Sequence, residues 1–176
     1  MKKIFAITAL SLIFISCTTN KTERDINTYI SKNIMADAQS VIMETTREDI
    51  TPDKIKITDM FGDAQNPFTG EKYFRDYVSY PYYSIRKFCS ALDGVITKID
   101  YPTNYYGDAN LSIIVKTEEL EIEYIGLMKI NPDLALGDKI NKGTYLATML
   151  GGGDSGMVLS IRMRYNGEVI NPAPWF

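Results

Sequence analysis

The sequence predicts a mostly β protein, namely a compact antiparallel β-sheet domain preceded by one amphipathic helix. Three observations lead to this fold class. From residue 55 onward, short β-type runs alternate with turn residues, and Asn166-Gly167 stands between two apolar alternations, as in a tight hairpin. Residues 22–47 instead contain no glycine or proline and repeat apolar side chains at helical spacing. With 176 residues, the chain can form one domain with a substantial core.

The start of the chain has the organisation of an export signal. Two lysines precede an apolar run over residues 4–15, which is too short to span a bilayer, and Ser16 then precedes Cys17. This arrangement resembles the bacterial lipoprotein signal, in which the cysteine is diacylated and becomes the new N-terminus. We therefore expect a signal peptide at 1–16 and a lipidated N-terminus with a short tether at 17–21, which anchor an exported protein to a bacterial envelope membrane. An ordinary cleaved signal with an incidental cysteine is the alternative.

Charge and cysteine content exclude several classes of function. Loss of Lys2 and Lys3 with the signal changes the net charge from −3 to −5. Such a chain lacks the basic surface that binds nucleic acid or anionic lipid headgroups, so we expect the lipid anchor to provide the membrane attachment. Cys89 has no second cysteine to pair with once Cys17 is lipidated, and we expect it to be a small buried apolar residue.

One amphipathic helix is predicted at 22–50. Thr51-Pro52 ends it, because a proline disfavours helical conformation in the residue before it. The helix either packs on the domain or serves as a spacer or partner-binding element. Its apolar positions, which recur near helical spacing, are Ile26, Ile30, Ile34, Ala38, Val41 and Ile42.

The remainder of the chain is predicted to form the β domain. Asn166-Gly167 predicts a type I′ turn, because both central residues of that turn need positive φ. The glycine-rich stretch 151–156 is interpreted as a connector, since no Lys-Ser/Thr follows it to make a phosphate-binding loop. The predicted strands are Val95–Asp100, Leu111–Thr117, Glu119–Leu127, Thr144–Leu150 and Met157–Tyr165.

Four motifs together resemble a known family. Their order and separations are those of LytM-type (M23 family) zinc endopeptidase domains, and the whole set is far more specific than any one motif. The motifs are the entry segments Ile57–Gly62 and Asn66–Lys72, then Asp93–Ile96, Leu136–Gly143 and Arg164–Pro172. The resemblance assigns residues 55–176 to a degenerate domain of this type. It implies a compact antiparallel β domain with a groove that admits a peptidoglycan stem or bridge peptide.

The residues on which the family's chemistry depends are replaced. The chain contains no histidine, although the family uses histidines to bind zinc and to orient the attacking water. The match places Arg75 at the first zinc-binding histidine and Ser79 at the zinc-binding aspartate. It places Gly126 at a histidine that orients the water, and Val158 and Ser160 at the general base and the last zinc-binding histidine. We therefore expect no metal or other cofactor and no peptidase activity, as in a pseudoenzyme.

The replaced positions can still line a binding groove. Arginine binds carboxylates through paired hydrogen bonds, and peptidoglycan peptides end in carboxylates, so Arg75 and Arg162 are candidate ligand contacts. Alternatively, Arg75 fills the lost metal pocket by pairing with an acidic neighbour. We call the candidate binding positions the relic groove, which comprises Arg75, Tyr77, Ser79, Gly126, Val158, Ser160 and Arg162.

Two features beside the relic groove have competing interpretations. Alternation in the strand at 119–127 places three glutamates on one face, which we interpret as a solvated face rather than a carboxylate site. Two tyrosine clusters suit peptide or glycan recognition and collapsed loop packing equally well. The glutamates are Glu119, Glu121 and Glu123, and the tyrosines are Tyr73, Tyr77, Tyr80, Tyr82, Tyr83, Tyr105 and Tyr106.

Three functions follow from these residues. The first is a membrane-anchored, catalytically inactive binding or regulatory module of the cell envelope, whose partner is cell-wall peptide or a wall-remodelling enzyme. The second is a structural or surface lipoprotein that makes no contact with the wall. The third, which the lost ligands contradict, is an active zinc endopeptidase that acts on peptidoglycan.

Overall fold

The computed structural model describes residues 25–34, 43–45, 57–81, 85–100, 111–127, 129–148 and 158–176. Residues 25–33 form a helix. The strands are β1 (Met43–Thr45), β2 (Gly62–Gln65), β3 (Lys72–Arg75), β4 (Val78–Pro81), β5 (Ile85–Cys89), β6 (Gly94–Asp100), β7 (Leu111–Lys116), β8 (Leu120–Leu127), β9 (Lys129–Ile130), β10 (Lys139–Ile140), β11 (Tyr145–Thr148), β12 (Val158–Tyr165) and β13 (Glu168–Ile170).

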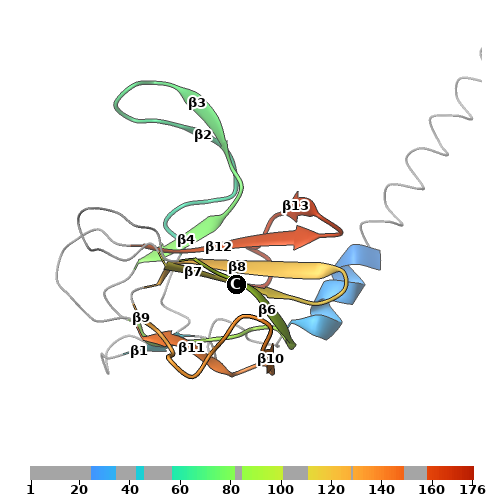
Figure 1. Ribbon diagram of the computed structural model, residues 1–176. Coiled ribbons are helices and arrows are strands. Elements are labelled where there is room, and N and C mark those ends of the chain that lie inside the picture. The colour runs from blue at the N-terminus through green and yellow to red at the C-terminus, as the bar shows by residue number, and fades with distance from the viewer. Residues whose placement is uncertain are drawn as a thin grey trace, which may run out of the picture. The chain divides into compact units, whose positions relative to one another are not determined.

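The strands form antiparallel sheets, which confirms the predicted fold class. The largest sheet has seven strands in the order β10-β6-β7-β8-β12-β13, and β4 also pairs with β12 (Figure 1). A four-stranded sheet has the order β1-β5-β11-β9, and β2 and β3 form a separate two-stranded ribbon. The long strands predicted from the sequence, which are β6, β7, β8 and β12, are the centre of the largest sheet.

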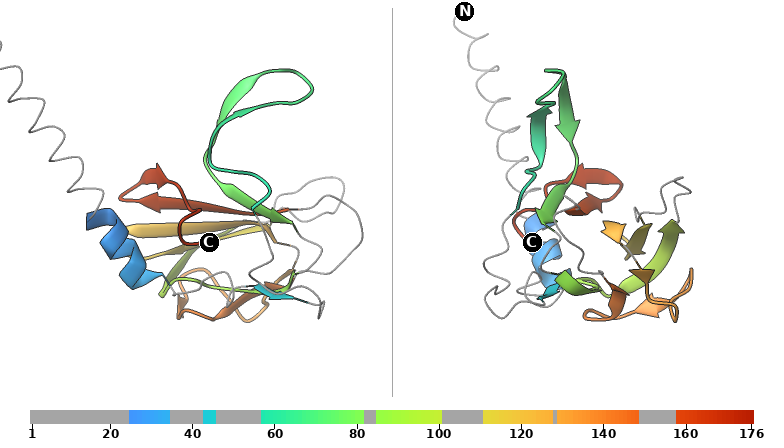
Figure 2. Two further views of the ribbon diagram at one scale, coloured as in Figure 1. Left: turned by 180° about the vertical axis from the view of Figure 1, so that it is seen from behind. Right: turned by 90° about the vertical axis from the view of Figure 1, so that its left-hand side faces the viewer.

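The core lies between the two larger sheets. Alternation along β8 buries Leu120, Ile122 and Tyr124 completely. The ring of Tyr124 packs edge-on against Phe88 of β5, with centroids 5.0 Å apart, and its hydroxyl accepts a hydrogen bond from the backbone N–H of Ala91 at 3.0 Å. One aromatic pair therefore connects the sheets, which face each other in both views of Figure 2.

The predicted helix is shorter than the sequence indicated. The helix at 25–33 is amphipathic, because Ile30 is buried whereas Asp25 and Asn27 are exposed. It belongs to a unit separate from the β domain, which begins at Ile34. The expectation of helix to residue 50 is wrong at β1, where Met43–Thr45 pairs antiparallel with β5. Pairing with an existing strand edge overrides the local helical pattern there.

The hairpin predicted at Asn166-Gly167 is confirmed. Asn166 has φ +50° and Gly167 has φ +85°, as a type I′ turn requires, and the turn joins β12 to β13. The expected signal at 1–16, the tether at 17–21 and the connector at 151–156 lie outside the described residues. Within the described residues, no helix has the length and apolar character needed to cross a membrane.

Two buried tyrosines of the core give a paired stability test. Among the described residues, the hydroxyl of Tyr80 has no hydrogen-bond partner, and burial raises its pKa above the ordinary value for tyrosine. Burial also raises the pKa of Tyr124, to about 12, but its hydroxyl satisfies the Ala91 amide. Both phenols are therefore neutral at physiological pH, and they differ in hydrogen bonding.

We expect Tyr80→Phe to stabilise the fold by up to about 1 kcal/mol, because it removes an unsatisfied buried hydroxyl. Tyr124→Phe should destabilise it by about 1–2 kcal/mol, because the Ala91 amide loses its acceptor. Thermal unfolding of both variants measures the difference, with about 3 °C expected per kcal/mol for a domain of this size. A lower melting temperature for Tyr80→Phe would show that its hydroxyl has a partner.

Candidate functional site

Two buried serines meet inside the relic groove. Ser79 of β4 and Ser160 of β12 are directly opposite each other in the antiparallel register. Their hydroxyl oxygens lie 2.8 Å apart, and the residues are only 1% and 7% exposed. One hydroxyl donates to the other, so neither is left as an unsatisfied buried group. The structure thus brings together the two positions that the sequence resemblance assigns to an aspartate and a histidine ligand.

Asp59 connects this serine pair to Arg75. The backbone N–H of Ser79 donates to the carbonyl oxygen of Asp59 at 3.0 Å. The Ser79 carbonyl in turn accepts the backbone N–H of Thr58 at 2.8 Å. The Asp59 carboxylate lies 3.2 Å from Nη2 of Arg75. Segment 57–60, the end of β3 and the start of β4 are therefore held together by one polar network.

Arg75 is occupied by these neighbours rather than extended into solvent. Besides the Asp59 contact, its Nη2 donates to the Tyr73 hydroxyl at 2.7 Å and its Nη1 donates to the Met60 carbonyl at 3.3 Å. The guanidinium lies 5.6 Å and 5.9 Å from the ring centroids of Tyr73 and Tyr77, and the side chain is 16% exposed. Burial lowers the pKa of Arg75, but Tyr73 and Asp59 more than offset this, so its pKa lies above the ordinary value.

Arg162 forms a second ionic cluster, two residues along β12 from Ser160. Its Nε lies 2.8 Å from one Asp76 carboxylate oxygen, and its Nη2 donates to the other at 2.9 Å. Its Nη1 donates to Glu123 of β8 at 2.6 Å. Burial lowers the pKa of Arg162, but the hydrogen bonds that it donates to Asp76 and Glu123 raise its pKa by more, so the guanidinium stays charged. Like Arg75, this arginine is already held by carboxylates of its own chain.

The glutamate face of β8 is not solvated, so that interpretation is wrong for two of its three members. Glu123 is 8% exposed and pairs with Arg162, while Glu121 pairs with Arg164 at 2.8 Å and with Lys116 at 3.7 Å. Alternation along the strand was correct, but the facing strands supply cations that cover these carboxylates. Opposite charges across neighbouring strands stabilise a sheet in this arrangement.

Three other relic-groove positions contribute little chemistry of their own. Gly126 has φ +90° and lies at the register shift between β7 and β8, where a β-bulge places one extra residue. Any residue with a side chain would be strained at this φ, which favours glycine over the family's histidine here. Tyr77 contacts Arg75 through its ring. For Val158 the structure gives only the pairing with Pro81 of β4.

The tyrosine clusters do not act as one surface. Tyr80 is completely buried, because it pairs with Leu159 on the core face of the sheet, and it is therefore not a groove wall. Tyr73 and Tyr77 lie at the Arg75 guanidinium. Tyr82, Tyr83, Tyr105 and Tyr106 lie outside the described residues. Cys89, expected to be buried, is a half-buried cysteine at the end of β5.

The donor chemistry of this site does not fit zinc. Catalytic zinc is held by imidazole, thiolate or carboxylate groups, whereas Ser79 and Ser160 offer neutral hydroxyls that bond to each other. Arg75 adds a permanent positive charge at the third position, which repels a cation. Within the described part of the chain, no group of three or more His, Cys, Asp and Glu side chains is placed to hold a metal ion.

Solved structures share the fold at low sequence identity. Csd3 from Helicobacter pylori matches with a TM-score of 0.54 and 19% identity, over 77% of this chain and 33% of that one. SpoIIQ in the SpoIIQ–SpoIIIAH pore-forming complex matches with a TM-score of 0.52 and 13% identity, over 77% and 92%. A zinc-containing peptidase from Vibrio cholerae matches with a TM-score of 0.52 and 17% identity, over 66% and 35%.

These matches establish a LytM-like fold, because backbone similarity persists at identities too low to indicate shared activity. The chain spans about a third of the length of Csd3 and of the Vibrio cholerae peptidase. No family model matches the sequence, and no curated protein matches it either.

Sequence analysis missed the acidic partners of both arginines. Asp59 lies within the first motif and Asp76 follows Arg75 directly, but no spacing rule relates Asp59 to Arg75 or Asp76 to Arg162, because each pair forms only when the chain folds. The proposal that Arg75 pairs with an acidic neighbour was therefore made without naming that neighbour. Sequence analysis placed Glu123 on one face of its strand but did not predict its ion pair with Arg162.

The Arg162 cluster gives a test of the buried ion pairs. Arg162→Met removes the closest cation of the nearly buried Glu123, at 2.6 Å, and leaves only Arg164 at 3.9 Å, so we expect the free energy of unfolding to fall by about 2–3 kcal/mol. Lys139→Met, which changes an exposed lysine of β10 away from this cluster, is the control and should leave stability unchanged. Urea unfolding measures both variants, and equal stability of Arg162→Met and the unmodified chain would show that Glu123 is solvated or protonated.

Proposed function

We propose that this chain is a membrane-anchored, catalytically inactive peptidase-like domain that acts as a binding or regulatory module in the cell envelope. The observation that supports it best is the hydrogen bond between the buried Ser79 and Ser160 hydroxyls. In a zinc peptidase of this fold, both positions point at the metal. Here their polar atoms are used to pair β4 with β12, which leaves no ligand set for a Lewis acid.

Loss of the metal removes the chemistry but not the frame. Peptide hydrolysis in this fold needs an activated water and a group to accept its proton. Gly126 and Val158 occupy the positions where the resemblance places the histidines for those roles, and neither side chain transfers protons. Both positions nevertheless lie on paired strands of the seven-stranded sheet, β8 and β12. A frame of this kind can still hold a binding surface for a partner.

The structural neighbours support a peptidase-like fold that can take part in a protein complex. The Vibrio cholerae protein of this fold is a zinc-containing peptidase, which connects the fold with peptide cleavage in that protein. SpoIIQ, which this chain covers over 92% of its length, is part of a complex with SpoIIIAH. The fold thus occurs in at least one protein–protein assembly, and we propose a wall-remodelling enzyme or cell-wall peptide as the partner of this chain.

A structural lipoprotein without wall contact is the second candidate. The covered state of Arg75 favours it, because a guanidinium that already binds Asp59, Tyr73 and Met60 must break these contacts to bind a ligand. The two candidates differ in whether groove variants change binding or only stability.

The absence of catalysis is tested with the purified mature chain. We expect less than one zinc ion per chain by elemental analysis, and no cleavage of peptidoglycan or of glycine-rich peptides when zinc is added. Lysostaphin, the antimicrobial peptidase from Staphylococcus simulans, serves as the active control of similar fold. One tightly bound zinc per chain together with hydrolysis that a chelator abolishes would contradict the proposed function.

The membrane anchor is tested separately. We expect Cys17→Ser to move the protein from the membrane fraction to the soluble exported pool, because lipidation supplies the predicted attachment. Ser16→Ala is a matched control, because it keeps a small residue before Cys17. If Cys17→Ser stays in the membrane fraction, another segment or a bound partner holds the protein there, and the lipid anchor is not needed.

A further inference from the structure

The β2–β3 ribbon is a part of the domain that the relic groove does not explain. Its strands pair only with each other, from Gly62↔Arg75 to Gln65↔Lys72, and the ribbon projects from the largest sheet (Figure 1). Each strand therefore has one edge that no other described strand covers. A two-stranded ribbon of this kind is marginal alone, and unpaired edges readily accept another strand.

The tip of this ribbon presents an aromatic ring to solvent. Phe68 is 95% exposed, in the turn between β2 and β3. The Oδ1 of Asn66 accepts the backbone N–H of Phe68 at 2.9 Å and that of Thr69 at 3.2 Å, and the Gly70 N–H donates to the Asn66 carbonyl at 2.9 Å. The backbone under Phe68 is thus fixed, which reduces the entropy lost when its ring is buried by a partner.

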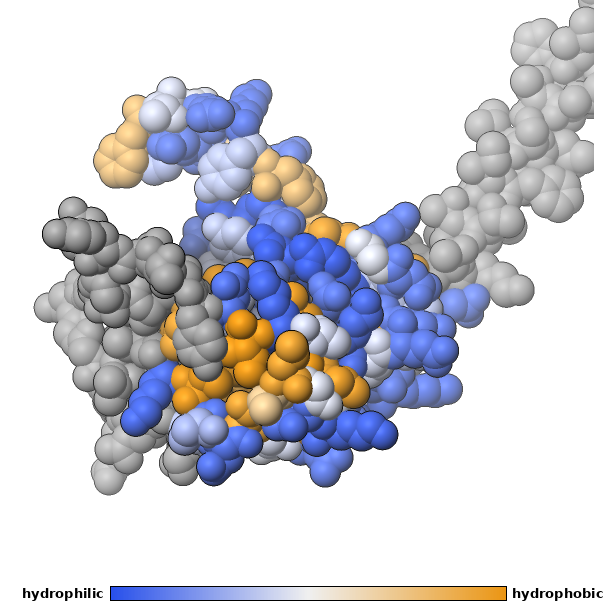
Figure 3. Space-filling view, in the orientation of Figure 1, coloured by the Kyte–Doolittle hydropathy of each residue, from blue (hydrophilic) through white to orange (hydrophobic). Residues whose placement is uncertain are grey.

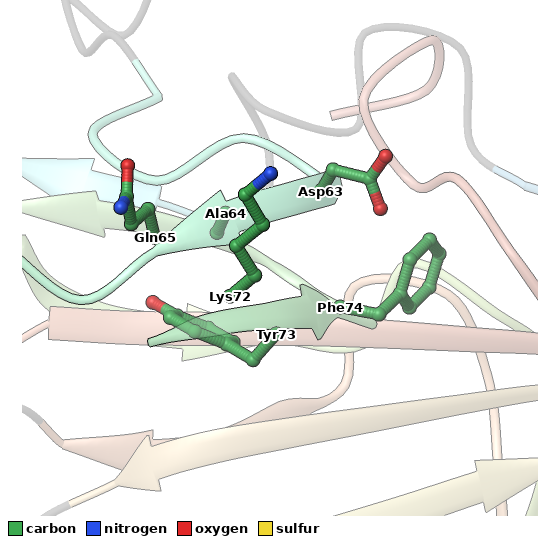
Figure 4. A pocket seen from close by; sticks show the side chains of 6 residues that line it. All are labelled: Asp63, Ala64, Gln65, Lys72, Tyr73 and Phe74. Atoms are coloured by element: carbon green, nitrogen blue, oxygen red, sulfur yellow. The ribbon is translucent and has the colours of Figure 1, made fainter. Parts of the chain in front are cut away.

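Apolar side chains are exposed at two separate places on the otherwise hydrophilic ribbon (Figure 3). The register puts Asp63 opposite Phe74 and Gln65 opposite Lys72, so these four side chains share a face. Figure 4 shows them around a shallow pocket of about 560 Å³. Phe74 is 59% exposed, although its ring also packs edge-on against Phe61.

The charges on this face are available to a ligand. Asp63 and Lys72 are both exposed, and neither forms an ion pair with any described residue. This differs from the relic groove, where Arg75 and Arg162 are already paired within the chain. Charges of both signs beside an exposed aromatic ring suit a peptide better than an anionic lipid surface, which the predicted net charge of −5 also disfavours.

We propose that the β2–β3 ribbon is a docking arm for an extended segment of another protein. The segment adds as a third strand to an open edge, where backbone hydrogen bonds give affinity. Its apolar side chains cover Phe68 and Phe74, and its charged side chains pair with Asp63 and Lys72. This surface is separate from the relic groove, so it adds a second binding site to the proposed function.

The probe is a phage-displayed library of random twelve-residue peptides, selected against the full exported chain. We expect selected peptides with alternating apolar residues, and binding at least tenfold weaker to Phe68→Ser and to Lys72→Glu than to the unmodified chain. Phe68 is almost fully exposed, so its loss leaves the fold intact. Leu136→Ser is the matched control, because Leu136 is 67% exposed in a turn outside the ribbon, and its binding should be unchanged.

Hydrogen exchange on the same complexes shows how the peptide binds. We expect slower amide exchange in β2 or β3, as strand addition requires. The proposal is overturned if no peptide is selected, if selected peptides bind both ribbon variants as tightly as the unmodified chain, or if protection appears only outside the ribbon. Binding of the chain to phosphatidylglycerol vesicles or to itself through Phe68, without peptide binding, also overturns it.

The result is independent of the catalytic test. A chain that cleaves peptidoglycan yet binds peptides through Phe68 would contradict the proposed function and support the docking arm. A chain that is inactive but selects no peptide would support the proposed function and contradict the docking arm.

Discussion

The hydrogen bond between Ser79 and Ser160 is the contact on which the arrangement of the relic groove depends. It joins β4 to β12 at a position that is almost completely buried, so each hydroxyl needs the other. Through the backbone of Ser79 it is continuous with Asp59 and so with Arg75 at the base of the β2–β3 ribbon. Neutral hydroxyls join the two strands here, and these are not the imidazole, thiolate or carboxylate groups that hold catalytic zinc.

Pairing of polar side chains within the chain continues along the sheet. One face of β8 carries the apolar core, and the other face carries Glu121 and Glu123, which pair with arginines of β12. Ion pairs of this kind contribute little net stability over apolar packing. Removing one partner nevertheless lowers the free energy of unfolding, because the other charge is left buried and unpaired. They also occupy the arginines that a carboxylate ligand needs. A partner is therefore more easily accommodated on the β2–β3 ribbon, where Phe68 and Lys72 are exposed and uncommitted.

The sequence was sufficient for those features that depend on local pattern. Alternation located the long strands, and Asn166-Gly167 specified its turn because only certain residues adopt positive φ there. The motif order correctly indicated the LytM-like fold. The prediction of a helix to residue 50 was wrong at Met43–Thr45, where pairing with β5 outweighs helical periodicity. The solvated interpretation of Glu121 and Glu123 failed for a related reason, since a strand's own sequence does not show which side chains its neighbour presents. The acidic partners of the arginines have no sequence signal at all.

The central claim is that side-chain contacts within the chain occupy the positions of the metal ligands. It is tested most directly by diffraction data collected at the zinc absorption edge from crystals grown with excess zinc. The account predicts no anomalous peak beside Ser79 and Ser160, and hydroxyl oxygens at hydrogen-bond distance from each other, as in the structure here. An anomalous peak about 2.0–2.2 Å from oxygen ligands at this position would contradict it, because that is the distance at which zinc binds oxygen.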